Sequence, residues 1–187
     1  FWNKPEFWEQ YGLDDYYMER RHIVESLLPK DVRSVLDVGA GRGEIINELG
    51  KRYRTVALDI SPVALRYVQC PRILGTIEAL PFRDLSFDLV MCLEVIEHLP
   101  DPIFRVAIQE LQRITRKWMI IGVPFKENLR ERFVRCPSCR KVFHADTHFR
   151  SFKSPEELVA LFPEFRLDKC VLGGPVSRRS TQLGLWL

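Results

Sequence analysis

The sequence predicts an α/β fold in which helices cover both faces of a doubly wound parallel sheet. Strand-like and helix-like segments alternate from Val32 to the C-terminus, a pattern typical of parallel strands joined by helical crossovers. A glycine-rich turn directly follows the first strand-like segment. Hydrophobic residues make up 46% and charged residues 28% of the chain, an ordinary balance for a domain with its own core. We therefore expect residues 1–187 to form a single domain.

The first predicted strand, Ser34–Val38, is apolar except for Asp37 near its end. Three glycines at alternate positions form the turn between it and the predicted helix Glu44–Leu49: Gly39, Gly41 and Gly43. Glycine permits positive φ and lets a ligand approach the main chain. Dinucleotide sites use G-x-G-x-x-G, whereas this chain has G-x-G-x-G. Asp37 would repel phosphates but attract the ammonium and sulfonium groups of S-adenosylmethionine.

Three further blocks follow along the chain. A second predicted strand, residues 54–58, ends at Asp59, and an acid there can accept hydrogen bonds from both ribose hydroxyls. Residues 75–82 read G-T-I-E-A-L-P-F, and residues 86–99 read S-F-D-L-V-M-C-L-E-V-I-E-H-L. With the glycine turn, these blocks resemble the class I S-adenosylmethionine-dependent methyltransferases over residues 35–125.

The resemblance implies a Rossmann-like sheet of seven strands in the order 3-2-1-4-5-7-6, with the last strand antiparallel. It implies an enzyme that moves a methyl group from S-adenosyl-L-methionine to an acceptor. Many relatives carry Asp where Thr76 stands, so the adenine contact is expected from Glu78 or the backbone of Ile77. The cofactor-binding residues implied in this way come from all four blocks: Asp37, Gly39, Ala40, Gly41, Asp59, Ile60, Ile77, Glu78 and Leu93.

Capping signals and apolar stripes predict the remaining elements. A capping side chain precedes a proline three times, at Ser61-Pro62, Asp101-Pro102 and Ser154-Pro155, and Glu157 completes a capping box with Ser154. The helix after Asp101 has apolar residues at helical spacing: Ile103, Val106, Ala107, Leu111 and Ile114. Residues 118–123 are predicted as the fifth strand.

Both ends of the chain carry further expectations. Residues 165–172 and 180–187 are predicted to pair as an antiparallel hairpin through the turn Gly173-Gly174-Pro175. Residues 11–28 are aromatic and basic, with a helix in the second half, so we expect residues 1–30 to form a lid over the cofactor. Arg20 and Arg21 are candidates for the cofactor carboxylate, and a solvent-exposed pair of helix arginines is the alternative.

A metal-like pattern lies in residues 126–153, an insertion between the fifth strand and the capping box. Its spacing is C-x2-C-x4-H-x3-H, formed by Cys136, Cys139, His144 and His148. Two thiolates and two imidazoles make a closed tetrahedral zinc set, which would be structural. The spacing resembles a zinc knuckle, although Phe143 replaces the usual glycine. A redox C-x-x-C pair and four unrelated surface residues are the alternatives.

The insertion is basic, with eight basic and three acidic residues, a net charge of +5 before histidines. This charge suits an anionic acceptor such as a carboxylate, phosphate or nucleic acid, and a solvated basic face is the alternative. We expect a zinc-stapled wall over the acceptor site. Because the chain has no appended nucleic-acid domain, a small-molecule acceptor is expected, with RNA left open.

His98 is the candidate catalytic base. It follows the fourth strand, on the carboxyl side of the sheet where ligands bind, and imidazole titrates near neutrality. A packing or capping role is the alternative. Methyl transfer mainly requires alignment, and a base is needed only if the acceptor loses a proton. Two other functions stay open: an NAD(P)-dependent oxidoreductase, and a non-catalytic S-adenosylmethionine-binding module that uses the insertion for a partner.

Composition also bears on location. The five cysteines suit a reducing interior, and no segment resembles a membrane span or a signal peptide. We expect a cytoplasmic protein without a membrane partner, and the net charge of +3 does not by itself indicate nucleic acid. The chain starts at Phe1 rather than Met, so whether a native N-terminal segment is missing stays open. The oligomeric state stays open.

Overall fold

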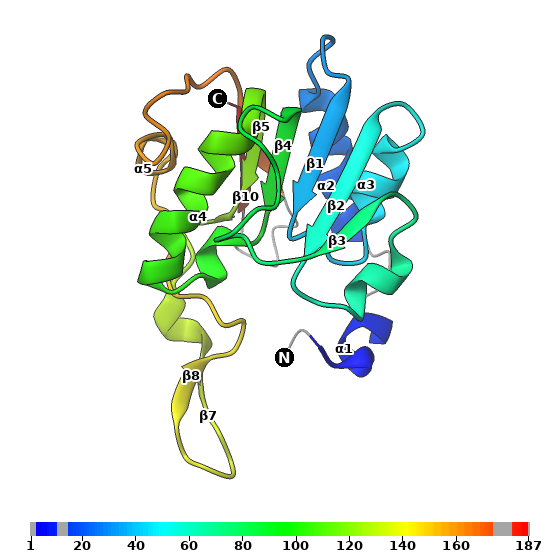
Figure 1. The fold of residues 1–187 in the computed structure, drawn as a ribbon. Helices are drawn as coiled ribbons and strands as arrows, with labels where there is room; N and C mark the ends of the chain where they lie inside the picture. Colours follow the sequence, from blue (N-terminus) through cyan, green and yellow to red (C-terminus); the bar gives the residue numbers. More distant parts are fainter. Residues whose placement is uncertain (1–2, 11–14, 174–180, 187) are drawn as a thin grey trace.

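The computed structural model describes residues 3–10, 15–173 and 181–186, and it is built on a central sheet (Figure 1). Five strands of this sheet are mutually parallel. In spatial order they are β3 (Arg72–Leu74), β2 (Arg54–Asp59), β1 (Ser34–Val38), β4 (Phe87–Leu93) and β5 (Thr115–Gly122). The predicted α/β class and the order of these five strands are confirmed.

An antiparallel strand, β10 (Thr181–Trp186), extends the sheet beyond β5. On its other side β10 pairs antiparallel with β9 (Cys170–Gly173), as the predicted hairpin requires. The turn residues Gly174 and Pro175 lie outside the described residues. The prediction of seven strands was wrong, because the sheet has eight over the described part of the chain. The additional strand is the two-residue β6 (Pro124–Phe125), which pairs with β10 and is separated from β5 by Val123.

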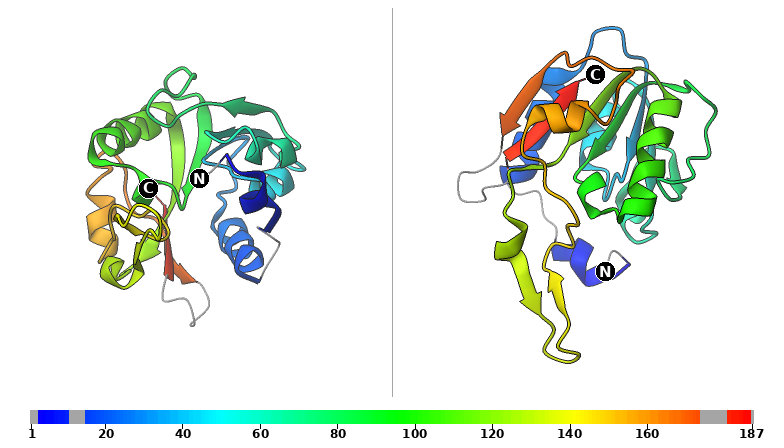
Figure 2. Two further views of the ribbon diagram at one scale, coloured as in Figure 1. Left: turned by 90° about the horizontal axis from the view of Figure 1, so that it is seen from below. Right: turned by 90° about the vertical axis from the view of Figure 1, so that its left-hand side faces the viewer.

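Helices cover both faces of the sheet (Figures 1 and 2). One face carries α4 (Asp101–Ile114) and α5 (Pro155–Val159), and the other carries α2 (Asp15–Leu27) and α3 (Glu44–Leu49). Two separate hydrophobic clusters fill the two interfaces. The helix predicted in the second half of residues 11–28 is therefore present.

Side-chain alternation along β4 shows how one strand serves both clusters. Val90 and Cys92 belong to the cluster beneath α4, whereas Leu89 and Met91 belong to the cluster beneath α2 and α3. Because successive side chains on a strand point to opposite faces, a strand covered on both sides must be apolar throughout. All four of these residues are fully buried.

The three predicted caps have different outcomes. Ser154 caps α5, accepting a hydrogen bond from the Glu157 N–H at 3.4 Å. Ser61 accepts from the Ala64 N–H at 3.2 Å, but only the short 3-10 turn η1 (Ala64–Tyr67) follows. Asp101 is already the first residue of α4, so Pro100 occupies the cap position that was predicted for Asp101.

The insertion leaves the sheet as a projecting hairpin. It contains the 3-10 turn η3 (Leu129–Arg132) and the antiparallel pair β7 (Phe133–Arg135) and β8 (Val142–His144). The hairpin extends past the carboxyl ends of the parallel strands, the edge where α1 (Pro5–Gln10) also lies (Figures 1 and 2). No helix in the described ranges is long and apolar enough to cross a membrane.

Candidate functional site

The glycine turn connects β1 to α3 through three residues in the left-handed region. The φ angles of Gly39, Gly41 and Gly43 are 78°, 55° and 76°. Gly39 also has no room for a side chain, because a Cβ atom there would lie 2.3 Å from Cγ2 of Val95. The turn therefore requires glycine for its conformation and, at Gly39, for close contact with the loop after β4.

The backbone N–H groups of this turn are hydrogen-bonded to the neighbouring strand. Gly39 and Ala40 both donate to the carbonyl oxygen of Leu58, at 2.8 and 3.1 Å. Gly41 donates to Oδ2 of Asp59 at 2.7 Å, and the other carboxylate oxygen accepts from the Ser61 N–H at 2.7 Å. Since the protein already uses these N–H groups, the turn does not present them to a pyrophosphate, as a dinucleotide site would.

Carboxylates surround the turn instead. Asp37 is buried, and its burial, followed by the negative charge of Asp59, raises its pKa to about 7. Arg20 acts in the opposite direction, and Glu44 raises the pKa further. Burial also raises the pKa of Asp59 and Glu44. A cationic ligand in contact with this group would relieve the mutual repulsion of the carboxylates.

The other predicted cofactor residues lie along the same edge of the sheet. Ile60 follows β2 and is 57% exposed beside the buried Asp59. Ile77 and Glu78 follow β3, the first buried and the second half-buried, and the half-buried Leu93 ends β4. Because parallel strands share one carboxyl edge, the structure brings all nine predicted positions to that edge.

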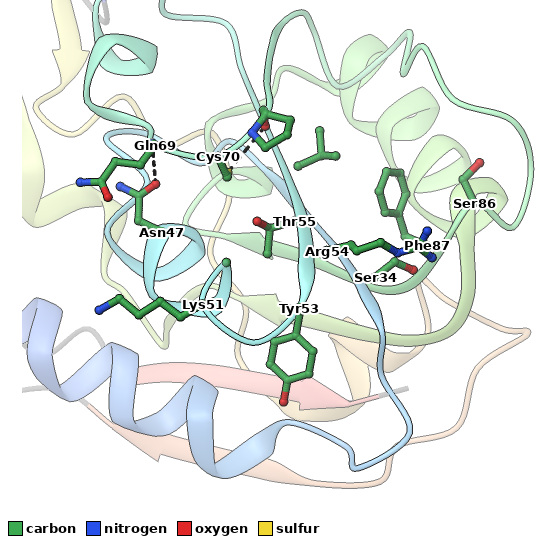
Figure 3. A pocket seen from close by; sticks show the side chains of 13 residues that line it. Ser34, Asn47, Lys51, Tyr53, Arg54, Thr55, Gln69, Cys70, Ser86 and Phe87 are labelled. Carbon is green, nitrogen blue, oxygen red and sulfur yellow. Dashed lines mark hydrogen bonds between the residues drawn. The ribbon is translucent and has the colours of Figure 1, made fainter.

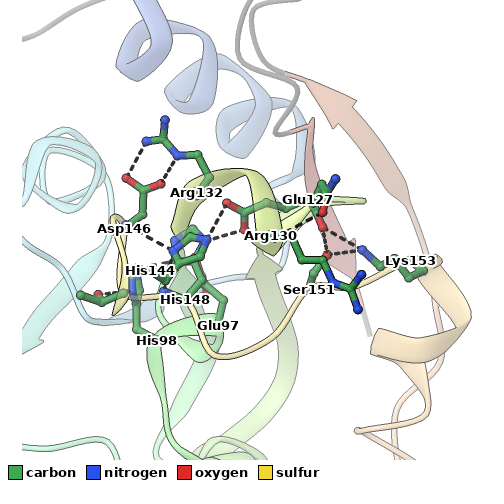
Figure 4. A network of polar contacts seen from close by, with 12 residues as sticks. Glu97, His98, Glu127, Arg130, Arg132, His144, Asp146, His148, Ser151 and Lys153 are labelled. Atoms are coloured by element: carbon green, nitrogen blue, oxygen red, sulfur yellow. Dashed lines mark hydrogen bonds and ion pairs between the residues drawn. The ribbon is translucent and has the colours of Figure 1, made fainter. Parts of the chain in front are cut away.

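A cluster of histidines and glutamates adjoins this edge at the base of the insertion (Figure 4). His98 and Glu97 lie in the 3-10 turn η2 (Ile96–His98), and His148 follows β8. The rings of His98 and His148 meet edge to face, with centroids 4.6 Å apart. Burial, together with His148, lowers the pKa of His98 to about 4, so His98 is neutral at physiological pH. Burial and the charge of Glu94 raise the pKa of the Glu97 carboxyl.

Comparison with known proteins identifies the fold around this edge. Residues 36–120 match the family described as "Methyltransferase domain". This segment is therefore similar to methyltransferase domains. This segment contains the glycine turn, Asp59 and the block that ends near His98.

Two relatives are similar to part of this chain. An uncharacterized protein of Methanocaldococcus jannaschii is 33% identical over 64% of this chain and 52% of its own length. The malonyl-[acyl-carrier protein] O-methyltransferase of Halorhodospira halophila is 37% identical over 50% of this chain and 35% of its own length. The chain thus spans about half of the first relative and about a third of the second.

The fold is also similar to that of solved methyltransferases. The N-methyltransferase NodS of Bradyrhizobium japonicum, solved with S-adenosyl-L-homocysteine, superposes with a TM-score of 0.70 at 18% identity. The superposition covers 98% of this chain and 97% of NodS. This likeness establishes the Rossmann-like methyltransferase fold for nearly the whole chain.

The four predicted zinc ligands do not meet in the structure. Cys136 and Cys139 lie at the tip of the insertion hairpin, whereas His144 and His148 lie at its base. The hairpin register pairs His144 with Phe133, three residues before Cys136, and a strand rises about 3.3 Å per residue. The thiols are therefore separated from the imidazoles by roughly 10 Å along the hairpin. The structure therefore does not bring the predicted zinc set together, because local spacing does not determine strand register.

Contacts other than a metal attach the insertion to the rest of the structure. The Phe149 N–H donates to the Glu97 carbonyl oxygen at 2.8 Å. Within the insertion, Arg132 pairs with Asp146 through two hydrogen bonds, at 2.8 and 2.9 Å, across the base of the hairpin. Both pairs bring together residues distant in the sequence, so no local motif predicts them.

Three residues of the site lacked a sequence signal. Trp8 of α1 is 6% exposed, and its indole would lie 3.3 Å from a Cβ atom on Gly41. Glu127 and Thr147 contact the histidine cluster from the insertion. In sequence, Trp8 is one aromatic among several in its segment, and Glu127 and Thr147 stand in no recognisable motif.

A cavity of about 740 Å³ lies at the opposite edge of the sheet (Figure 3). Its walls come from the amino ends of strands, with Ser34 of β1, Arg54 of β2 and Phe87 of β4 among them. In open parallel sheets ligands bind at the carboxyl ends of the strands. This cavity is therefore distinct from the candidate site at the carboxyl ends of the strands.

Proposed function

We propose that this protein transfers a methyl group from S-adenosyl-L-methionine to a small-molecule acceptor. The observation that carries the proposal is the environment of the glycine turn. Asp37, Asp59 and Glu44 place carboxylates around it, and the turn's own N–H groups are bonded within the protein. Such a site favours a cationic sulfonium nucleoside over the pyrophosphate of a dinucleotide.

Each predicted residue has a place in holding the donor. The turn Gly39–Gly41 and Asp37 would receive the methionine part, with its ammonium group. Asp59 would accept hydrogen bonds from the ribose hydroxyls, since an ionised carboxylate has lone pairs beyond the two it uses for Gly41 and Ser61. Ile60, Ile77, Glu78 and Leu93 would line the remainder of the donor site.

His98 serves the acceptor end of the proposed reaction. It follows β4 at the same edge of the sheet, and its imidazole is neutral because its pKa is lowered to about 4. Nδ1 of His98 lies 3.1 Å from Oγ1 of Thr147, a contact that orients the ring, and the neutral imidazole would take a proton from an acceptor hydroxyl or amine. The basic insertion beside it suits an anionic acceptor.

Ligand binding tests the donor part of the proposal. Thermal unfolding is measured with S-adenosyl-L-homocysteine and with NAD+ as separate probes, and binding is then quantified by calorimetry. Because a ligand that binds only the folded state raises its stability, S-adenosyl-L-homocysteine should raise Tm and NAD+ should not. A rise with NAD+ alone would overturn the proposal.

Methyl transfer is tested separately with donor that carries an isotope-labelled methyl group. The labelled donor is incubated with a fractionated pool of small metabolites, and label is followed by mass spectrometry. Label in a small molecule, lost in the Asp59→Ala variant, supports the enzyme. Binding of the donor without transfer to any fraction would instead favour a non-catalytic binding module.

A further inference from the structure

We propose that Glu97, His98 and His148 bind a divalent transition-metal ion. One ligand atom from each of the three residues lies within 4.8 Å of the other two. Two imidazoles and one carboxylate form a donor set that binds Zn²⁺, Mn²⁺, Fe²⁺ or Co²⁺. The set differs from the cysteine and histidine pattern in the sequence, because it joins η2 to the base of the insertion (Figure 4).

Both histidines are held by hydrogen-bond partners at Nδ1. His148 donates from Nδ1 to Oε2 of Glu127 at 2.5 Å, which leaves the lone pair on Nε2. Nδ1 of His98 lies 3.1 Å from Oγ1 of Thr147, and its Nε2 faces Glu97. Histidines that bind metals usually donate their second N–H to a carboxylate or another oxygen, which fixes the ring. His148 and Glu127 have this arrangement.

Glu97 provides an independent reason to place a cation here. Its side chain is 0% exposed, and within the described chain neither carboxylate oxygen has a hydrogen-bond partner. A buried carboxyl group without a partner is costly, and a bound cation would supply one. Oε1 of Glu97 lies 3.9 Å from Nε2 of His98. Ligands that each bind an ion at about 2.1 Å stand roughly 3 Å apart, so the three ligand atoms would have to close by about 1–2 Å to complete the site.

A neighbouring group, Glu127 with His144 and His148, has a similar spacing but different chemistry. Nδ1 of His144 accepts the N–H groups of Asp146 and His148, at 3.3 and 3.2 Å. Its proton is therefore on Nε2, which leaves no lone pair there for a metal. His144 instead stacks on His148 with ring centroids 5.0 Å apart. We assign His144 and Glu127 to holding His148 in place.

The position of this site favours an acceptor that carries a hydroxyl group. Val95, which contacts the glycine turn at Gly39, precedes Glu97 by two residues, so the ion would adjoin the donor site. Three protein ligands leave positions for an acceptor oxygen, and a bound divalent ion lowers the pKa of a hydroxyl. This step rests on the proposed function. The hydroxyl releases its proton to water, and its oxygen bonds the methyl carbon as the sulfur–carbon bond breaks. With the ion bound, the Nε2 lone pair of His98 binds metal rather than a proton.

Cobalt binding tests the site without reference to activity. The full chain, free of any affinity tag and of other metals, is titrated with Co²⁺ alone while its visible and near-ultraviolet absorption is recorded. We expect visible ligand-field bands without the thiolate charge-transfer band that cysteine ligation would produce. The matched control is the double variant Cys136→Ser with Cys139→Ser, which should bind Co²⁺ as the wild type does.

The ligand variants provide the decisive comparison. His98→Ala and His148→Ala should each weaken Co²⁺ binding by at least about tenfold, and Glu97→Gln should do so while preserving side-chain volume. Glu127→Gln, which weakens the orienting contact, should lower the affinity by about tenfold. Circular dichroism confirms that each variant is folded.

Two results would overturn the site. One is Co²⁺ affinity within twofold of wild type in all three ligand variants. The other is a thiolate band that disappears in the cysteine control. Binding of S-adenosyl-L-homocysteine is measured on the same samples, so failure of the metal site is distinguished from failure of the proposed donor site.

Discussion

The guanidinium of Arg150 donates from Nη1 to the carbonyl oxygen of Ile96, 2.8 Å away and 54 residues earlier in the chain. The same nitrogen donates to the Leu99 carbonyl oxygen at 2.6 Å, and Nη2 donates to Asp101 at 2.7 Å. The guanidinium carbon also lies 3.7 Å from the centroid of the Phe104 ring. One side chain of the insertion thus holds the turn that carries Glu97 and His98, without any metal.

Replacing Arg150 should therefore disturb this turn. Hydrogen bonds from a charged donor contribute about 1.5–3 kcal/mol each, and lysine cannot reproduce the planar, multiply bonded geometry. We expect Arg150→Lys to lower the free energy of unfolding by roughly 2 kcal/mol, measured by urea denaturation. Arg130→Lys in the exposed part of the insertion is the matched control and should change it little. Equal effects of the two variants would contradict the assigned role.

Asp59 links the glycine turn to the expected ribose position. Its carboxylate accepts from the Gly41 and Ser61 N–H groups, at 2.7 Å each. Asp59→Ala removes both of these acceptors and the proposed ribose contact, so affinity for S-adenosyl-L-homocysteine should fall by about 10- to 100-fold. Calorimetry measures the loss. Glu48→Gln, at a half-buried position on α3, should bind normally, and unchanged binding by Asp59→Ala would exclude the ribose role.

Asp37 gives the protein a pH dependence of stability with a definite sign. Burial, followed by the charge of Asp59, raises its pKa from 3.8 to about 7. Between about pH 4 and pH 7 the folded protein keeps a proton that the unfolded chain has released, so this contribution to stability falls as the pH rises. Asp37→Asn should raise the free energy of unfolding by roughly 2 kcal/mol at pH 8, and by less at pH 5. Urea denaturation at both pH values measures the difference, and a destabilised variant at pH 8 would contradict it.

Ligand binding at the donor site should release a proton from Asp37. The ammonium group of the bound ligand would favour ionised Asp37, although Arg20 already provides part of that effect. Affinity for S-adenosyl-L-homocysteine should therefore rise from pH 5.5 to pH 7.5 in the wild type, by about tenfold at most. The rise should be smaller in Asp37→Asn. Calorimetry in buffers of different ionisation enthalpy would detect the released proton directly, and equal proton release in both proteins would exclude Asp37.

Gly39 should be intolerant of a side chain for two separable reasons. A Cβ atom there would overlap Val95, and the φ of 78° is strained for any other residue. Gly39→Ala should cost roughly 2–4 kcal/mol in chemical denaturation. Adding Val95→Ala should restore only the part of the stability that is lost through the steric overlap. Gly75→Ala is the control, since its Cβ atom would meet Leu58 at an ordinary 3.4 Å, and it should be nearly neutral.

The tip cysteines should be dispensable for folding. Cys136 is half-buried and Cys139 exposed, and the hairpin holds both away from the histidines. The double serine variant should keep the thermal midpoint of the wild type, with or without a chelator. A drop of several degrees, together with zinc in unchelated wild-type protein, would restore the cysteine and histidine zinc set.

Local sequence predicted the parts of the fold that depend on neighbouring residues. The bounds expected for β1 and α3 are those observed, because a short apolar run and a glycine-rich turn both act within a few residues. β2 begins at the expected Arg54 and ends on the expected Asp59. These ends also position the donor residues, so the donor side of the candidate site followed from sequence.

The acceptor side depends on pairings that sequence spacing does not determine. Cys136 and His144 are eight residues apart, yet the register of β7 against β8 places them at different levels of the hairpin. Glu127 meets His148 across 21 residues, and Thr147 meets His98 across 49. Such contacts arise only after the insertion has folded back onto η2.

The burial of Asp37 has a consequence for repeated turnover. In the proposed reaction the sulfonium becomes a neutral thioether, so the spent cofactor brings one positive charge fewer to the carboxylates around the glycine turn. Coulomb attraction scales with charge and is strengthened where water is excluded. The buried carboxylates should therefore retain the product less strongly than the incoming donor. The burial of Asp37 therefore favours the replacement of bound product by new donor.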